Sequence, residues 1–595
     1  MLKASRMPFC FSSLLPAVCL FLFASVAVLP AARLRADNAV DAAVLEAQQR
    51  RIDAIQRGLP AAVSIFAGEA GGGAGVLISA DGYALTNYHV VQPAGVAMRC
   101  GLPDGHLYDA VLVGLDPTGD VALIKLLGRD DFPHAELADS DLVEVGDFCF
   151  AAGNPFLLAT DLQPSVSVGI VSGIHRYQFP AGTILEYTDC LQVDAAINPG
   201  NSGGGLFDAA GRIIGVNGRA SFEKRGRVNV GVGYAISANQ LRNFVGGLMG
   251  GRLVDHATFG ATVATSADGR VVVSDILERS DAFRRGLRYD DEIVALAGRP
   301  VRTVNAFKNI LGTLPAGWQV PLAYRRSGRR IDTLVRLAGV HTPAQLAKLV
   351  ATDGEPEPQP GQEGRPAKPP VKLPADVAVV YEARPGFTNH HFNIVERDRV
   401  ARAVAGHAPG GNAEDWVIEG RLTAGGTFRI QLSDREGVID LPTGTTRVDA
   451  TRDLDAAPNP PGSGGLLGAL LVWRRLLRDG PAAVGRTEYW GTMPVFPHPP
   501  LADATAGQGP PDLMDVLSTS VAAIEARFAV DDSGRIAAID FWHQPDADPC
   551  EVRFSGRLAA TAAAGLPAVM DVWRGSDHFA TFEIEAVSFG TREDR

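Results

Sequence analysis

The sequence predicts a multidomain, mainly β protein, and three observations support this prediction. The chain has 595 residues, more than a single hydrophobic core usually supports. It contains 66 glycines and 39 prolines, which are typical of many turns between short strands. Short apolar runs such as "GVLIS", "VALIKLL" and "RIIGVN" recur between residues 61 and 248, separated by turn residues. We therefore expect a β-barrel or β-sandwich in this region, followed by further domains.

Residues 1–36 have the features of an export signal. Lys3 and Arg6 precede an apolar run from Phe9 to Pro30, and small residues follow it. This run is longer than a usual signal core, so an uncleaved N-terminal membrane anchor is the alternative interpretation. Both interpretations place the rest of the chain outside the cytoplasm, in the periplasm or another extracytoplasmic compartment.

Residues 37–60 are expected to form an amphipathic helix. Apolar residues stand at Val40, Val44, Ile52 and Ile55, with charged residues between them. This spacing predicts one apolar face.

The sequence changes character twice after the first β-rich region. Residues 256–340 mix strand patterns with two short helical patterns, around 280–285 and 304–311, which predicts an α+β domain. Residues 353–374 are dominated by Pro, Glu, Gly and Lys and should form an extended linker. Residues 375–595 then form a separate β-rich region of unknown fold and function.

The C-terminal region offers only local expectations. Residues 417–432 and 523–539 both read as strand, turn, strand, and a helix is expected at 466–477. Two similar hairpins arise by duplication or by convergence, and the sequence does not decide between them. His390 and His391 are adjacent, and on a strand they would face opposite sides, so we expect no metal site there.

The net charge and the cysteine content limit the partners and the disulfide bonds that we expect. The net charge of −12 gives no overall attraction to nucleic acid. Outside the signal segment the cysteines are too sparse for a disulfide framework. Cys149 and Cys190 form either one bridge or a pair of buried thiols. No cofactor and no metal are expected.

Three segments contain the residue types that acyl transfer by a serine requires. His89 follows an apolar run in "ALTNYHVV", and Asp120 stands between a Pro/Gly turn and the apolar run "VALIKL". Ser202 lies in "INPGNSGGGLFD", where glycines permit backbone conformations that aim consecutive N–H groups into one concavity. Each signal is weak alone, but the order His89, Asp120, Ser202 is that of a chymotrypsin-type triad.

These segments resemble the HtrA family of trypsin-fold serine proteases. The match runs in order through "GAGVLIS", "ALTNYHVV", "LDPTGDVALIKL", "FAAGNPF", "LQVDAAINPGNSGGGLFD" and "GVGYAIS". The resemblance implies a double six-stranded β-barrel at residues 61–248, with catalytic His89, Asp120 and Ser202 in the cleft between the barrels. It also implies an oxyanion hole at Gly200, Asn201 and Ser202.

The same resemblance indicates a specificity pocket. Ala196 stands six residues before the nucleophile, where this fold sets the floor of the first pocket. With Ile197 and Val216 nearby, the pocket is expected to accept small or medium aliphatic side chains.

Residues 256–340 resemble the PDZ domain that follows such proteases. "TFGATV" matches the carboxylate-binding loop and its strand, so the expected peptide-binding residues are Phe259, Gly260, Ala261, Thr262 and Val263. The chain departs from the family pattern at Asp290, which replaces a glycine; aspartate tolerates the left-handed conformation.

The leading hypothesis is an exported, ATP-independent serine endopeptidase that degrades misfolded or damaged envelope proteins. The family resemblance implies unfolded or peptide substrates, C-terminal peptides at the PDZ domain, and a homo-oligomer such as a trimer. Two alternatives stay open: a PDZ-bearing scaffold or chaperone whose protease fold is inactive, and a regulated protease with one dedicated substrate.

Overall fold

The computed structural model describes residues 41–67, 72–154, 161–178, 185–222, 229–352, 373–408, 415–450, 463–500, 510–521, 524–544, 547–558 and 566–590. The predicted signal segment and nearly all of the predicted linker lie outside these ranges. Within them, no helix is long and apolar enough to cross a membrane. The chain divides after Gln49 into two compact units.

A helix, α1 (Ala42–Gly58), lies within the range predicted for one. Val44 and Ile52 of the predicted apolar face are exposed, whereas Ala54 is buried. Gly58 ends the helix where no side chain fits, because a Cβ there would lie 2.9 Å from the Phe207 ring. Close packing, more than the apolar face, therefore fixes the end of this helix.

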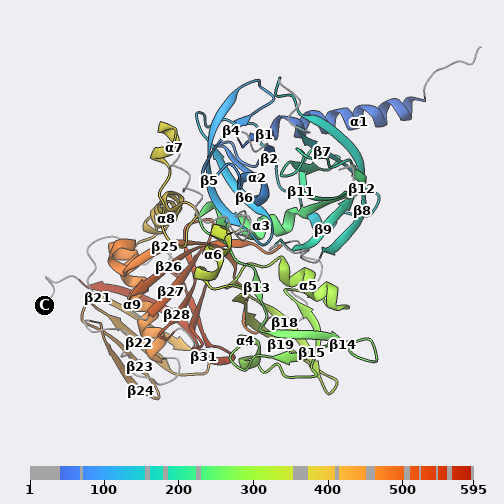
Figure 1. The fold of residues 1–595 in the computed structure, drawn as a ribbon. Coiled ribbons are helices and arrows are strands. Elements are labelled where there is room, and N and C mark those ends of the chain that lie inside the picture. Colours follow the sequence, from blue (N-terminus) through green and yellow to red (C-terminus); the bar gives the residue numbers. More distant parts are fainter. Residues whose placement is uncertain are drawn as a thin grey trace, which may run out of the picture. The chain divides into compact units, whose positions relative to one another are not determined.

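Two closed six-stranded barrels follow, one drawn in blue and one in teal in Figure 1. The first has the strand order β1-β2-β3-β6-β5-β4 and the second has the order β10-β11-β12-β9-β8-β7. Small barrels of this size are filled by their own side chains, and buried Val, Leu, Ile and Ala residues make up most of both cores. The predicted chymotrypsin-like double barrel is confirmed.

The strands of the first barrel are β1 (Ala62–Phe66), β2 (Gly72–Leu77), β3 (Tyr83–Thr86), β4 (Ala97–Gly101), β5 (Leu107–Asp116) and β6 (Val121–Leu126). Those of the second are β7 (Phe148–Gly153), β8 (Ser165–Gln178), β9 (Tyr187–Val193), β10 (Gly205–Phe207), β11 (Ile213–Phe222) and β12 (Asn229–Ser237). The helices of this part are η1 (Leu59–Ala61), α2 (Tyr88–Val91), η3 (Ser140–Leu142) and α3 (Ala238–Met249).

Residues 256–340, predicted to be α+β, contain a third sheet and two short helices. Its strand order is β14-β15-β16-β18-β19, with β17 paired to β16, and β13 pairs separately with β20. Both predicted helices are present, and Asp290 has a φ of +67°, the left-handed conformation expected of it. The elements are β13 (Ala257–Thr258), β14 (Ala261–Thr265), β15 (Val271–Ile276), α4 (Asp281–Arg284), β16 (Glu292–Leu296), β17 (Arg299–Pro300), α5 (Val304–Gly312), β18 (Gln319–Arg326), β19 (Arg329–Arg336), β20 (Ala338–Gly339) and α6 (Pro343–Thr352).

The C-terminal region is one eleven-stranded antiparallel sheet with a long apolar helix against it (Figure 1). Its order, β24-β23-β22-β21-β31-β30-β29-β28-β27-β26-β25, joins two meanders through the pair β21 and β31. Leu466, Leu467, Leu470 and Leu471 of α9 are fully buried. The predicted helix and both predicted hairpins, β21–β22 and β27–β28, are confirmed.

Its helices are α7 (Ala375–Val379), α8 (His390–Ala405), α9 (Ser463–Asp479) and η6 (Pro481–Val484). Its strands are β21 (Asp415–Leu422), β22 (Thr427–Leu432), β23 (Glu436–Leu441), β24 (Gly444–Asp449), β25 (Arg486–Pro494), β26 (Leu513–Val521), β27 (Ile524–Val530), β28 (Ile536–Trp542), β29 (Cys550–Ser555), β30 (Val569–Arg574) and β31 (Asp577–Gly590).

The structure corrects one expectation and answers one open question. His390 and His391 begin helix α8 and do not lie on a strand, because the Asn389 side chain accepts a hydrogen bond from the His391 N–H and caps the helix. Cys149 and Cys190 are free and buried, so the two thiols form no bridge.

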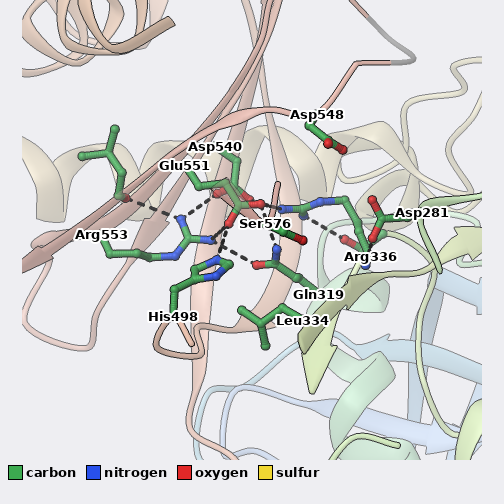
Figure 2. Close-up of polar contacts among 12 residues, drawn as sticks. Asp281, Gln319, Leu334, Arg336, His498, Asp540, Asp548, Glu551, Arg553 and Ser576 are labelled. Atoms are coloured by element: carbon green, nitrogen blue, oxygen red, sulfur yellow. Dashed lines mark hydrogen bonds and ion pairs between the residues drawn. The ribbon is translucent and has the colours of Figure 1, made fainter. Parts of the chain in front are cut away.

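A buried ionic network joins the third sheet to the C-terminal sheet (Figure 2). Arg336 on β19 contacts Asp540 at 2.8 Å and Glu551 at 3.3 Å, and Arg553 contacts the same two carboxylates at 2.7 and 3.0 Å. Burial alone would raise the pKa of Glu551, but Arg553, His498 and Arg336 hold it well below its usual range. The charges of the two carboxylates and the two guanidinium groups therefore balance, and His498 adds a further contact to Glu551 at 2.7 Å.

Candidate active site

His89 is held where the first barrel ends strand β3 and begins the short helix α2. Its side chain is 39% exposed, so the imidazole is open to solvent on one side. The preceding residues tie this corner to the Asp120 segment: the Asn87 side-chain amide and the Tyr88 N–H donate to the Asp120 carbonyl at 3.0 and 3.2 Å. The histidine therefore comes from a corner whose backbone is fixed on the Asp120 turn.

Asp120 closes the tight turn between β5 and β6. It is fully buried and has a φ of +58°, in the left-handed region, which residues other than glycine rarely adopt and aspartate adopts more readily than most. Such strain persists only where the surrounding structure holds it in place. Here the Asp116 carboxylate accepts a hydrogen bond from the Gly119 N–H at 2.8 Å and shapes the turn from inside.

His89 and Asp120 form a direct pair. The Asp120 Oδ2 lies 2.8 Å from His89 Nδ1, and Oδ1 accepts from the His89 backbone N–H at 3.0 Å. A carboxylate only accepts, so Nδ1 must donate, which leaves Nε2 of the neutral ring free to take a proton. Burial lowers the pKa of His89, but the Asp120 charge more than offsets this and the pKa lies above its ordinary value.

Tyr187 also contacts Asp120. This residue was not predicted from the sequence. It lies at the start of β9, is almost fully buried, and its hydroxyl donates a hydrogen bond to Asp120 Oδ2. The contact spans 67 positions, and no local pattern around Tyr187 marks it. The buried carboxylate thus accepts from three donors, which fixes its orientation toward the imidazole.

Ser202 lies in a turn that bridges the two barrels. Its carbonyl accepts from the Ala74 N–H of the first barrel at 2.9 Å, while the Gly203 N–H donates to Asn217 of the second barrel at 2.7 Å. Gly203 has a φ of +85°, and a Cβ there would lie 2.3 Å from Thr86 Oγ1, three residues before His89. Close backbone packing therefore brings the serine turn to the histidine corner, and only glycine fits.

The Ser202 hydroxyl does not meet His89 directly in this structure. Its Oγ donates to the Gly218 carbonyl at 3.2 Å, and among the described residues no hydrogen bond joins it to the imidazole. Catalytic hydrogen bonds are often long or misaligned without substrate and form in the complex. The structure thus brings His89 and Asp120 together and places Ser202 at the same junction, with its proton directed elsewhere.

The turn before Ser202 positions main-chain donors. The Asn201 N–H donates to the Asn198 carbonyl at 2.9 Å, and Gly200 has a φ of +102°, as the third residue of a type II turn requires. Type I and type II turns differ by a flip of the central peptide, so this φ decides to which side the Gly200 N–H points. Of the predicted oxyanion donors, Asn201 is engaged in the turn, whereas the N–H groups of Gly200 and Ser202 have no partner among the described residues.

The three predicted pocket residues differ in exposure. Ala196 is exposed and its carbonyl accepts from the Asn201 side chain at 3.3 Å. Ile197 and Val216 are buried in the hydrophobic cores of the barrels. Ala196 is therefore the only one of the three whose side chain faces outward.

The predicted peptide-binding segment lies at the edge of the third sheet. Strand β14, with Ala261, Thr262 and Val263, ends the strand order and pairs only with β15 among the described strands. Gly260 precedes it with a φ of +69°, and a Cβ there would lie 2.5 Å from Ser280 Cβ. Phe259 is buried against Phe307, with ring centroids 5.4 Å apart. β14 is therefore an edge strand, and strand addition takes place at such an edge.

No cluster of His, Cys, Asp or Glu suited to a metal ion occurs among the described residues.

Comparison with known proteins identifies relatives that match part of the chain. Residues 73–216 match the trypsin-like peptidase domain. The chain is 35% identical over 279 residues to the periplasmic serine endoprotease DegP of Escherichia coli (strain K12), covering 44% of this chain and 56% of that protein. It is 36% identical over 299 residues to a probable periplasmic serine protease do/HhoA-like of Haemophilus influenzae, covering 47% and 62%. The chain thus spans little more than half the length of these relatives.

Among solved structures, the HtrA-type protease AlgW with tripeptide is 30% identical, with a TM-score of 0.40, and the match covers 49% of this chain and 98% of AlgW.

Proposed function

We propose that this chain, whose residues 73–216 match the trypsin-like peptidase domain and which is 35% identical over 279 residues to DegP of Escherichia coli, is an exported, ATP-independent serine endopeptidase of the HtrA family. The observation that carries the proposal is the buried Asp120 carboxylate held 2.8 Å from His89 Nδ1 beside the glycine-rich turn of Ser202. A base oriented by an acid next to such a turn is the arrangement that acyl transfer needs.

The chemistry follows from these groups. Ser202 Oγ turns from the Gly218 carbonyl toward His89 and attacks the peptide carbonyl, while Nε2 takes its proton. The N–H groups of Gly200 and Ser202 stabilise the oxyanion of the tetrahedral intermediate, and each is worth about 3–4 kcal/mol. His89 then donates the proton to the leaving amine, and water repeats the sequence to release the acid. Asp120, fixed by Tyr187, keeps Nδ1 protonated throughout.

We assign the substrates and partners on the same basis. The cleft between the barrels takes unfolded or peptide segments of exported proteins, and the relatives are named periplasmic enzymes, which supports an extracytoplasmic location. The edge of β14 takes a peptide carboxylate by strand addition in a PDZ-like manner. Assembly into a homo-oligomer such as a trimer, and anchorage by residues 1–36, belong to the same proposal.

One observation favours a second candidate. Ser202 Oγ donates to Gly218 and not to His89, which is what a binding protein with an idle protease fold would show. That candidate is a PDZ-bearing scaffold or chaperone.

Comparison of the wild-type protein with a Ser202→Ala variant on unfolded casein separates the two candidates. The peptidase proposal predicts fragments with the wild type and none with the variant, and equal fragment release by both proteins would refute it. Protection of casein from aggregation by both proteins without any fragments would support the scaffold.

A further inference from the structure

A second buried histidine–aspartate pair lies directly behind the Asp120 turn. His256 Nε2 is 2.9 Å from Asp116 Oδ2 and 3.0 Å from Oδ1, and both side chains are buried. The histidine comes from outside the barrels: its carbonyl accepts from the Val340 N–H at 3.0 Å, next to the β13–β20 pair. A residue of the following segment therefore reaches into the turn that holds the catalytic carboxylate.

His256 contacts both the side chain and the backbone of this turn. Asp116 accepts from the Gly119 N–H with the same carboxylate that His256 holds. A Cβ at Gly119 would lie 2.3 Å from Asp116 Oδ2 and 2.8 Å from His256 Nε2, so the ring packs against the turn backbone itself. The next residue is Asp120 in its left-handed conformation. A strained residue keeps its place only while its neighbours do.

We propose that His256 is a positioning residue for the catalytic aspartate: by holding Asp116 and packing on Gly119, it fixes the turn that aims Asp120 at His89. The inference rests on the proposed peptidase activity. His256 touches neither substrate nor the reacting atoms, so it acts through the alignment of the His89–Asp120 pair. Misplacing a catalytic group by about 1 Å costs up to about 100-fold in rate.

The pair is also sensitive to pH. The carboxylates that act on His256 come from the Asp116 turn, from Glu186 before β9 and from the adjacent Asp255, while Phe244 of α3 packs on the ring at 4.6 Å. Burial lowers the pKa of His256, but Asp116 and the other carboxylates raise it above its ordinary value. A raised pKa means that the charged pair is present at lower pH and weakens as pH rises through that pKa.

Two substitutions at His256 test the role, with matched controls at His341. His256→Phe keeps an aromatic ring but removes the donor, and His256→Gln keeps a donor near Nε2 but does not titrate. His341 forms a similar pair with Asp255, at 2.9 Å, and neither residue belongs to the Asp116–Asp120 turn, so His341→Phe and His341→Gln report the general cost of the same changes beside His256. Steady-state cleavage of a chromogenic peptide from about pH 5 to 10 gives kcat and KM for each protein.

We expect His256→Phe to lower kcat by about 10- to 100-fold with KM within about twofold, because alignment is lost and binding is not. The wild type should show a decline in kcat at alkaline pH, and His256→Gln should keep kcat near neutral pH and lose that decline. Both His341 variants should match the wild type. Wild-type kcat in His256→Phe, or an unchanged alkaline decline in His256→Gln, would overturn the proposal.

A structural readout keeps the test independent of activity. In a crystal structure of His256→Phe, the His89 Nδ1 to Asp120 distance should exceed hydrogen-bond reach, about 3.2 Å. An unchanged distance would contradict the positioning role even if no condition gave turnover. Where His256→Phe does not fold, the pH profile of His256→Gln decides. A wild-type protein that cleaves nothing would refute the peptidase function and leave the crystallographic comparison to judge His256.

Discussion

Replacing Asp120 by asparagine is expected to lower kcat by about 10⁴-fold, equivalent to about 5.5 kcal/mol, while the fold stays intact. The change is isosteric, so the packing of the turn is preserved. What it alters is the proton on the neighbouring imidazole.

The contacts around residue 120 determine which ring nitrogen of His89 carries the proton in this variant. Oδ1 accepts from the His89 backbone N–H at 3.0 Å, so the amide NH₂ of an asparagine would be repelled there and would take the Oδ2 position. At that position it faces the Tyr187 hydroxyl, which can rotate to accept, and His89 Nδ1, which must then accept too. The neutral ring is left with its proton on Nε2 and no base for Ser202.

The assay is steady-state cleavage of a chromogenic peptide near pH 8, with thermal unfolding measured in parallel. A matched control is Asp571→Asn, because Asp571 holds His578 at 2.9 Å on the C-terminal sheet, far along the chain from the triad. The control should cleave at the wild-type rate. An Asp120→Asn protein that folds and retains kcat within tenfold of the wild type would refute the assignment of Asp120 as the residue that orients His89.

Three further outcomes follow from the same contacts. Burial lowers the pKa of His89, but Asp120 raises it by more, so kcat/KM should increase with pH through a midpoint above about 6.5. In Asp120→Asn this midpoint should move to lower pH. An unchanged midpoint would contradict the pairing of His89 with Asp120. Tyr187→Phe removes a hydrogen bond to the buried Asp120 carboxylate, so it should lower the free energy of unfolding by about 1.5–3 kcal/mol and also lower kcat. Tyr177→Phe loses a similar bond to Glu186 and should leave kcat unchanged in the same assay. Arg336→Ala removes one guanidinium from two buried carboxylates and should lower the free energy of unfolding, measured in urea, by about 3–5 kcal/mol. Arg330→Ala breaks an exposed pair with Asp332 and should lower it by less than about 1 kcal/mol. Equal losses would contradict the account of the network in Figure 2.

The strands of the barrels could be predicted from local signals, whereas the double barrel and the catalytic residues were predicted from the order of motifs that resemble the HtrA family. Short apolar runs between turns define the strands, and the glycine-rich motif around Ser202 is specific to one kind of turn. The positive φ values at Gly200 and Gly203 show why glycine stands there: a side chain would collide with the backbone or reverse the turn. Because these requirements restrict the residues that can stand at such positions, the turn could be predicted from the amino-acid sequence.

The partners of the triad could not be predicted, because they depend on contacts between distant segments. Tyr187 reaches Asp120 across 67 positions, and His256 reaches Asp116 across 140. The C-terminal sheet is similar, since its two meanders join through β21 and β31, which are far apart in the chain.

His390 and His391 show a different kind of error. The strand assignment overlooked the capping signal of Asn389, which stood in the sequence.

The central claim is that Ser202 is a nucleophile activated by His89. The most direct measurement is the mass of the intact protein after reaction with diisopropyl fluorophosphate, followed by peptide mapping. The account predicts a single phosphoryl adduct on Ser202 in the wild type and a strongly reduced rate of labelling in a His89→Ala variant. An unmodified Ser202, or labelling at the same rate without His89, would contradict it.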